Sequence, residues 1–297
     1  MIYGTLLSLF PPRLREAVTA LFPTEPPEEI RVRRCRPVSL TSGGETLLPG
    51  VTLNGNETDR LFSDLCLGSS HAFEVEIGEG YVPLGDGMRL GLGGTFDLTG
   101  EGSAVTVRGV RQVETLVLRL PHEVPDAALP VYRIWEKKGF RGGVLLYAPP
   151  GGGKTTVIRD LSRLLGGKTC RKRAVVIDDR REIFQRDFFS DTVTDFVTGL
   201  PKQAGLEIAV RALSPEVLLC DEIGASEAGE IRRTAGSGVP LIATVHASSF
   251  AELKVRPGIG ELLSDGIFPT VIGITRKNGT LFFREECFSP AGNRRTE

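Results

Sequence analysis

A short apolar run, a turn rich in proline and glycine, and a helix-like segment follow one another at residues 144–165. The run Val144–Tyr147 is typical of a buried strand, and Lys154–Leu165 has the spacing of a helix. In this arrangement the backbone N–H groups of the turn point at an anion bound at the helix N-terminus. Glycine is needed in the turn because a Cβ would block the approach of the anion. The segment therefore predicts a phosphate-binding loop within an α/β sheet.

The loop follows the pattern G-x-x-x-x-G-K-[ST], with Ala148 at the first position, where glycine is usual. In this pattern Lys154 reaches the β- and γ-phosphates, and the hydroxyl of Thr155 ligates Mg²⁺. The alternative is a glycine-rich turn with a lysine placed by chance, and the order of strand, loop and helix argues against it. The residues expected to bind the nucleotide are Pro149, Pro150, Gly151, Gly152, Gly153, Lys154, Thr155 and Thr156.

A second apolar run, Val217–Cys220, ends in the carboxylates Asp221 and Glu222. Hydrolysis of a nucleotide needs one group to order the metal and another to polarise the attacking water. We assign the first role to Asp221 and the second to Glu222. Standing alone, the segment would equally be a buried strand followed by two solvated acids. The glutamate directly after the aspartate, and the lack of an N-K-x-D segment that reads guanine, favour ATP as the substrate.

A third apolar run, Leu241–Val245, ends at His246. In the sheet order typical of such ATPases, this strand lies between the two strands that carry the nucleotide motifs. Thr244 and His246 would then lie near the γ-phosphate and sense its presence. A structural histidine is the competing interpretation.

Several arginines are candidates for contacting phosphate in a neighbouring subunit, as an arginine finger does. Arg180 and Arg181 belong to a charge cluster that follows the apolar run Val175–Ile177, although a solvated loop would look the same. Arg211 lies on a helix expected over residues 203–213. The candidate catalytic residues are thus Glu222, Lys154, His246, Arg211 and Arg180, with Thr155 and Asp221 as metal ligands.

The second half of the chain alternates strands and helices, which predicts a parallel sheet with crossover helices. Its expected strands are 143–147, 174–177, 216–220, 240–245 and 270–275, and Asn278-Gly279 predicts a hairpin that returns 281–283 as an edge strand. A helix over 12–22, a strand over 29–40, a hairpin over 80–94 and strands at 105–107 and 115–120 predict a smaller α+β domain. Prolines between 121 and 130 separate the two, giving domains of 1–125 and 126–288 and a disordered tail of 289–297.

Composition limits the function classes open to the chain. A net charge of -1 in 297 residues gives no electrostatic reason to expect a nucleic-acid partner. The apolar stretch at the N-terminus is too short to span a bilayer and makes a poor signal peptide. The five cysteines are scattered without a C-x-x-C pair, which favours reduced thiols in a cytosolic protein over disulfides or zinc.

Taken together, these motifs resemble one family. GVLLYAPPGGGKTT, VVIDDRREI, LPKQAGLEIAVRALSPEVLLCDEIG and PLIATVHASS, in that order, are similar to segments of the stage III sporulation protein AA family. EEIRVRRCRPVSL and GYVPLGDGMRLGLGG resemble the same family, whereas the ATPase motifs alone are shared with type II and type IV secretion ATPases. The family usually has glycine where Ala148 stands and glutamate where Asp179 stands.

The resemblance implies a RecA-like P-loop ATPase core preceded by the smaller α+β domain. It also implies ATP and Mg²⁺ as cofactors and a homo-oligomer, a hexameric ring by analogy with the secretion ATPases. The expected place of action is the cytoplasm of the mother cell, at the forespore outer membrane. There the protein would power or assemble a channel with membrane proteins of its operon, and His246 would couple loss of the γ-phosphate to motion. Two alternatives stay open: an ATPase that acts on nucleic acid, and a nucleotide-dependent scaffold with little turnover.

Overall fold

The computed structural model describes residues 2–66, 73–78, 80–100, 106–186, 188–277 and 279–288. The chain divides into two compact units, Met1–His122 and Glu123–Glu297. The division falls in the proline-rich stretch that begins at Pro121. The tail expected to be disordered, residues 289–297, lies outside the described residues.

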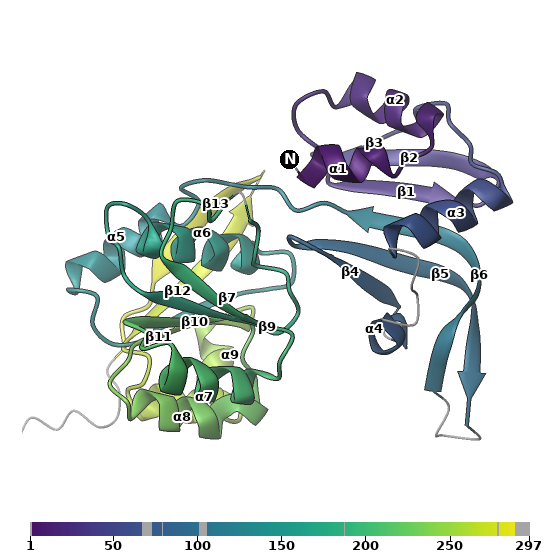
Figure 1. Ribbon diagram of the computed structural model, residues 1–297. Coiled ribbons are helices and arrows are strands. Elements are labelled where there is room, and N and C mark those ends of the chain that lie inside the picture. Colours follow the sequence, from purple (N-terminus) through teal and green to yellow (C-terminus); the bar gives the residue numbers. More distant parts are fainter. Residues whose placement is uncertain are drawn as a thin grey trace, which may run out of the picture. The chain divides into compact units, whose positions relative to one another are not determined.

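The first unit is a six-stranded sheet with helices (Figure 1). The strand order is β3-β2-β1-β6-β5-β4, and every pair in it is antiparallel. Apolar side chains of α2 and α3, among them Leu14 and Leu61, share a core with the strands. Its elements are α1 (Ile2–Ser8), α2 (Pro12–Leu21), β1 (Glu29–Arg33), β2 (Arg36–Ser42), β3 (Glu45–Leu47), α3 (Gly55–Leu65), α4 (Glu74–Gly78), β4 (Tyr81–Gly85), β5 (Met88–Thr99) and β6 (Thr106–Arg119).

Two expectations for this unit were wrong in detail. The strand expected over 29–40 is two strands, β1 and β2, which form a hairpin, because the chain turns at Arg34-Cys35 with Cys35 at φ 54°. The strands expected at 105–107 and 115–120 fall, from Thr106 to Arg119, on one strand, β6, whose pairing with β5 continues across both segments, while residue 105 lies outside the described residues. In the first case the apolar positions resume at Val38 and Leu40 after the arginine-rich residues 33–36, and in the second the polar stretch between the two apolar segments stays paired with β5, so the apolar pattern alone does not mark where a strand breaks. The hairpin expected over 80–94 is confirmed as β4 and β5.

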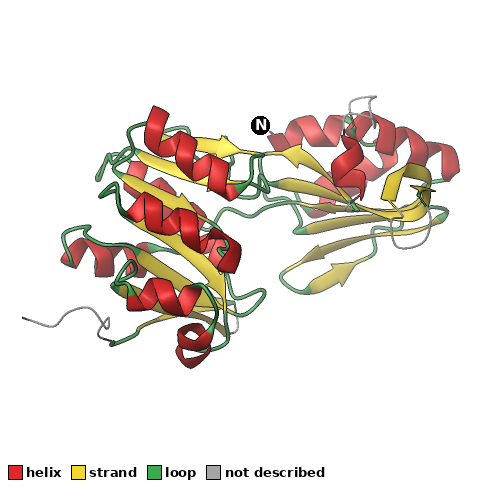
Figure 2. Cartoon of the chain, turned by 90° about the horizontal axis from the view of Figure 1, so that it is seen from below, coloured by secondary structure: helices red, strands yellow, loops and turns green. Residues whose placement is uncertain are grey.

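The second unit is a seven-stranded sheet with helices on both faces (Figure 2). The strand order is β13-β12-β7-β11-β10-β8-β9, parallel except for the hairpin β12–β13. Its elements are α5 (Leu129–Lys137), β7 (Val144–Ala148), α6 (Lys154–Gly166), β8 (Ala174–Asp178), β9 (Thr194–Thr198), α7 (Lys202–Ala212), β10 (Val217–Cys220), a 3₁₀ turn (Ala225–Glu227), α8 (Ala228–Ala235), β11 (Leu241–His246), α9 (Phe250–Val255), α10 (Ile259–Ser264), β12 (Thr270–Lys277) and β13 (Thr280–Glu285).

The strand order confirms the expected position of β11 between β7 and β10. The central strands β7, β8 and β10 are buried along their whole length, as strands covered on both faces should be. Helices α5 and α6 cover one face and helices α7 to α10 cover the other. The phosphate loop, Asp221 and His246 therefore follow three adjacent strands at the same edge of the sheet, the carboxyl edge.

Candidate functional site

The phosphate loop joins β7 to α6 at the carboxyl edge of the sheet. Gly153 precedes the first residue of α6 and has a φ of 91°, a left-handed conformation that favours glycine. A Cβ at Gly153 would also lie 2.9 Å from Cδ2 of Leu281 on β13. Both observations explain why this position is glycine. The N-terminus of a helix of 13 residues faces the loop, so its free N–H groups and its dipole favour an anion here.

Ala148, which stands where glycine is usual, is accommodated by the loop. Its side chain is fully buried, and a Cβ added to Gly152 would lie 2.6 Å from the Cβ of Ala148. The methyl group of Ala148 thus takes space that Gly152 leaves open. This departure from the usual pattern leaves the loop conformation intact.

The ammonium of Lys154 has three acceptors. Its Nζ lies 3.0 Å from the carbonyl oxygen of Ala148, 3.2 Å from that of Pro149 and 2.6 Å from Nδ1 of His246. Because an ammonium only donates, Nδ1 of His246 accepts, and the ring proton is then on Nε2. Burial lowers the pKa of Lys154, while the nearby carboxylates of Asp221 and Glu222 act in the opposite direction. A phosphate that binds Lys154 would have to replace one of these acceptors.

Asp221 connects the phosphate loop to the strand that carries the second motif. The hydroxyl of Thr155 donates to Oδ2 of Asp221 at 3.0 Å, and the hydroxyl of Thr244 donates to Oδ1 at 2.5 Å. The pair Thr155–Asp221 therefore presents hard oxygen atoms beside Lys154. Mg²⁺ prefers oxygen ligands and is usually held by one or two carboxylates together with substrate phosphates. These residues fit that ion.

Glu222 is held in an unusual backbone conformation. Its φ is 44°, which is rare for a residue with a side chain. Its N–H donates to the hydroxyl of Thr244 at 2.8 Å, and its carboxylate lies 3.1 Å from Nε2 of His246 and 3.3 Å from Nη1 of Arg180. The carboxylate is about one-third exposed. Because the Nε2 proton of His246 faces Glu222 while Nδ1 faces Lys154, His246 bridges the lysine and the glutamate.

Most of the residues predicted to act on the nucleotide line one hollow of about 280 Å³. Of the predicted loop residues, Pro149 and Pro150 line a neighbouring hollow of about 510 Å³ instead. The lining of the first hollow is Gly151, Gly152, Gly153, Lys154, Thr155, Thr156, Asp221, Glu222, His246 and Arg276.

Thr244 corrects one expectation. It was expected to lie near the γ-phosphate and to sense its presence, but its side chain is fully buried. Its hydroxyl accepts from the N–H of Glu222 and donates to Asp221. Thr244 therefore holds the carboxylate of Asp221 and the backbone N–H of Glu222, and its side chain is not part of the lining of the hollow.

The candidate arginines occupy different places. Arg180 pairs with Glu222 of its own chain. Arg211 pairs with Glu207 on the same helix, α7, at 2.8 Å and is 76% exposed. Helix α7 ends shortly before β10 begins, so Arg211 lies toward the amino edge of the sheet, opposite the phosphate loop. A role for either arginine in a neighbouring subunit stays a prediction.

Two aspartates of this charge cluster, Asp178 at the end of β8 and Asp179 directly after it, serve the fold. Asp178 is buried and accepts from three successive backbone N–H groups, those of residues 182, 183 and 184. Burial raises the pKa of Asp178, and these hydrogen bonds act in the opposite direction. Asp179 pairs with Lys202 at 2.8 Å. Together these contacts fix the loop that carries Arg180.

Two arginines at the site were not predicted from the sequence: Arg276, on β12, and Arg256, which donates to the carbonyl oxygen of His246. Arg276 comes two residues before the Asn278-Gly279 turn, and its position in the hairpin gave no sign that it faces the loop. The turn itself includes Asn278, outside the described residues, but the pairing of Lys277 with Thr280 confirms the hairpin.

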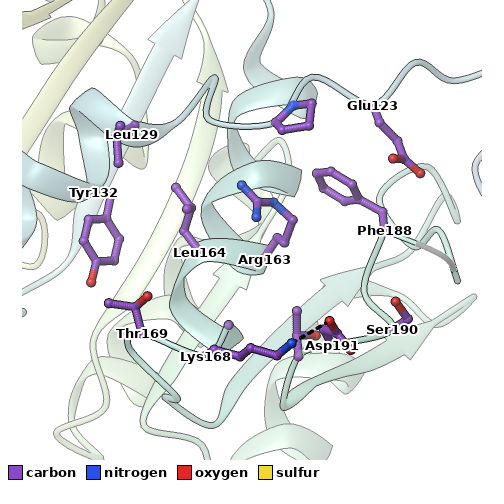
Figure 3. A pocket seen from close by; sticks show the side chains of 13 residues that line it. Glu123, Leu129, Tyr132, Arg163, Leu164, Lys168, Thr169, Phe188, Ser190 and Asp191 are labelled. Atoms are coloured by element: carbon purple, nitrogen blue, oxygen red, sulfur yellow. Dashed lines mark hydrogen bonds and ion pairs between the residues drawn. The ribbon is translucent and has the colours of Figure 1, made fainter.

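A larger hollow, of about 570 Å³, lies toward the C-terminal end of α6 (Figure 3). Its cations already have partners. Lys168 pairs with Asp191 at 2.9 Å, and Arg163 pairs with Asp160 at 2.7 Å while its guanidinium lies over the ring of Phe188. The C-terminal end of a helix also disfavours an anion. This hollow is therefore a poor site for a nucleotide despite its size.

The sheet order and the constellation at its carboxyl edge define a RecA-like P-loop ATPase fold. Solved structures of similar fold include the ATPase DotB of Legionella pneumophila, with a TM-score of 0.62 and 16% identity over 94% of this chain and 80% of that one. The pilus retraction motor PilT, solved with bound ADP, gives a TM-score of 0.59 and 17% identity over 89% and 79% of the two chains. At these identities the likeness shows the fold.

Sequence comparison gives the family. The family described as "Sporulation stage III, protein AA" matches residues 9–281, and the chain belongs to this family. Stage III sporulation protein AA of Bacillus subtilis (strain 168) is 29% identical over 264 residues, which are 85% of this chain and 83% of that protein. Across the described residues, no helix combines the length and the apolar character needed to cross a membrane.

Proposed function

We propose that this protein is a Mg²⁺-dependent ATPase that energises or assembles a channel complex between mother cell and forespore during endospore formation. The observation that carries the hydrolytic part is the network in which Lys154, His246 and Glu222 are connected directly beside the Asp221–Thr155 pair. A purely nucleotide-binding loop would not need a carboxylate held at a strained position next to the lysine. The role in sporulation is supported by the family to which the chain belongs.

The residues have distinct roles in this proposal. Lys154 and the N–H groups of the loop bind the phosphates, and Thr155 with Asp221 would hold Mg²⁺. The metal would supply neutralisation of charge on the phosphate oxygens. Glu222 accepts the proton of the water that attacks the γ-phosphate. If the phosphate replaces His246 among the three acceptors of Lys154, Nδ1 of His246 loses its partner, and its contact with Glu222 would change as a result.

The partners and the location belong to the same proposal. A hexameric ring rests on the resemblance to secretion ATPases, and a motor-like action is consistent with the fold shared with the pilus retraction motor PilT. We propose that the ring works in the mother-cell cytoplasm and reaches the forespore outer membrane through membrane proteins of the channel. The net charge of -1 gives no electrostatic reason to expect nucleic acid as a partner.

Three variants of the full chain test the hydrolytic part: Glu222→Gln, Lys154→Ala and the control Glu207→Gln, an exposed glutamate on α7. We expect Glu222→Gln to bind ATP and to release phosphate at least about 100-fold more slowly than the wild type, because it loses the group that accepts the proton. Lys154→Ala should lose ATP binding, and Glu207→Gln should behave as the wild type. Phosphate release and ATP binding are measured on the same preparations.

The biological part is tested in a spore-forming host. If Glu222→Gln binds ATP, does not hydrolyse it and still supports normal spore formation, hydrolysis is not what the cell needs. That result would reject the motor function and favour a scaffold that responds to nucleotide binding. We expect spore formation to fail with Glu222→Gln and to proceed with Glu207→Gln.

A further inference from the structure

The hairpin of β12 and β13 extends beyond the rest of the sheet at its carboxyl edge. Pairing of β12 with β7 runs from Thr270 to Gly273, whereas its pairing with β13 continues to Lys277. Side chains alternate between the two faces of a strand. Ile272 and Ile274 lie in the core on the α6 face. Arg276 is the next residue on that face, beyond the core and above the N-terminus of α6.

Leu281 fixes the hairpin to the phosphate loop. It pairs directly with Arg276 across the hairpin, and its Cδ2 lies 2.9 Å from the position of a Cβ on Gly153. The same residue packs against the core that contains α6. Arg276 is thereby placed along the hollow lined by residues 151–156. Its position follows from packing and not from a loop that could move independently.

Arg276 differs from the other cations near the hollow. Lys154 has acceptors in two loop carbonyls and His246, and Arg180 is paired with Glu222. The side chain of Arg276 is exposed, and within the described segments it has no ion pair or hydrogen bond. A guanidinium is planar and offers several donors to phosphate oxygens. It is the arginine best able to take a phosphate without breaking an existing contact.

Resting on the proposed ATPase function, we propose that Arg276 binds the diphosphate part that ADP and ATP share, in the same subunit as the loop. The groups for hydrolysis, Asp221, Glu222 and His246, come from β10 and β11, on one side of β7. Arg276 comes from β12, on the other side. A phosphate chain with its terminal phosphate at Glu222 therefore has its remaining phosphates nearer to Arg276. This assigns Arg276 to nucleotide affinity and leaves sensing of the γ-phosphate to His246.

The test measures binding of ADP and of ATP, each with Mg²⁺, to full chains carrying Arg276→Ala, Arg276→Lys or Lys277→Ala. Lys277 is exposed on the same hairpin and faces the other way, so its variant removes one charge without touching the hollow. We expect Arg276→Ala to lower the affinity for both nucleotides by about tenfold or more, since a hydrogen bond to a charged group is lost. The affinity of Arg276→Lys should lie between those of Arg276→Ala and the wild type, and the affinity of Lys277→Ala should match that of the wild type. Dilution to the smallest assembly, checked by sedimentation, should leave the loss unchanged.

Several results would overturn the proposal. Affinities of Arg276→Ala within twofold of the wild type for both nucleotides would do so, as would a loss confined to ATP or an equal loss in Lys277→Ala. A defect that disappears on dilution would place the contact in a neighbouring subunit and also reject it. Wild-type protein that binds both nucleotides but does not hydrolyse ATP would instead reject the proposed function, while the binding result still decides the role of Arg276.

Discussion

Replacing Thr244 by valine removes a single hydroxyl from the centre of the site and leaves the shape of the side chain unchanged. Thr244 is fully buried on β11, and its hydroxyl accepts from the N–H of Glu222 and donates to Asp221. Valine fits the strand and the space but can do neither. The carboxylate of Asp221 and the backbone N–H of Glu222 therefore lose the group that connects them.

The size of the effect follows from these two hydrogen bonds. A buried N–H left without an acceptor costs about 1–3 kcal/mol, and a hydrogen bond to a charged group is worth about 1.5–3 kcal/mol. Part of this sum appears as lower stability, and we expect the free energy of unfolding to fall by about 2–4 kcal/mol. The N–H of Glu222, a residue with a φ of 44°, also loses its acceptor, so we expect its carboxylate to shift. A misplacement of about 1 Å can cost about 100-fold in rate, and we expect kcat for ATP hydrolysis to fall by that factor.

Thr270→Val is the matched control for Thr244→Val. Thr270 is a buried threonine at the start of β12, at the amino edge of the same sheet, and its hydroxyl accepts from Lys138 at 2.8 Å. We expect this variant to lose stability in urea unfolding and to keep its kcat. Phosphate release by Thr244→Val at the wild-type rate, with a stability loss like that of Thr270→Val, would refute the role given to the hydroxyl.

Two further predictions concern the loop and the thiols. Gly153→Ala should destabilise the fold by about 1–2 kcal/mol, because alanine is strained at a φ of 91°, and it should abolish ADP binding. The control Gly229→Ala, in α8 with open space around it, should leave stability unchanged or raise it. When native protein is treated with iodoacetamide at pH 8, mass spectrometry should find the label on the exposed Cys35 and Cys287 but not on Cys66. Burial raises the pKa of Cys66 to about 11, so about a thousandth of this thiol is thiolate at that pH. Binding of ADP by Gly153→Ala, or rapid labelling of Cys66, would count against the packing on which these predictions depend.

The sequence predicts the carboxyl edge of the large sheet well because each motif there follows a run of apolar residues. Such runs mark strands that are buried on both faces, and the polar residue after each run then lies at a known edge. The strand β9, Thr194–Thr198, was missed for the opposite reason. It is an edge strand of five residues, none of them fully buried, and its sequence TDFVT has no apolar run.

Local signals were also present but unused. Helix α3 begins with a capping box, in which Asn54 accepts from the N–H of Glu57 and Glu57 accepts from that of Asn54. The pattern Asn-x-x-Glu before a helix-like segment is readable from the sequence. The turn at Arg34-Cys35 has no such signal, because neither residue is typical of a left-handed conformation. The hairpin there is fixed by pairing with β6, which joins residues far apart in the chain.

The arginines show where sequence reasoning reaches its limit. Arg211 could have been placed from the sequence, because a helix that ends before a parallel strand lies at that strand's amino edge and the phosphate loop lies at the other. Arg276 could not, because its position depends on how far the β12–β13 hairpin extends past β7 and on Leu281 packing against Gly153. Neither the length of this extension nor the packing of Leu281 can be predicted from a local motif. Residues that a motif contains can thus be found by pattern, whereas a residue brought to the site by the packing of two distant elements needs the structure.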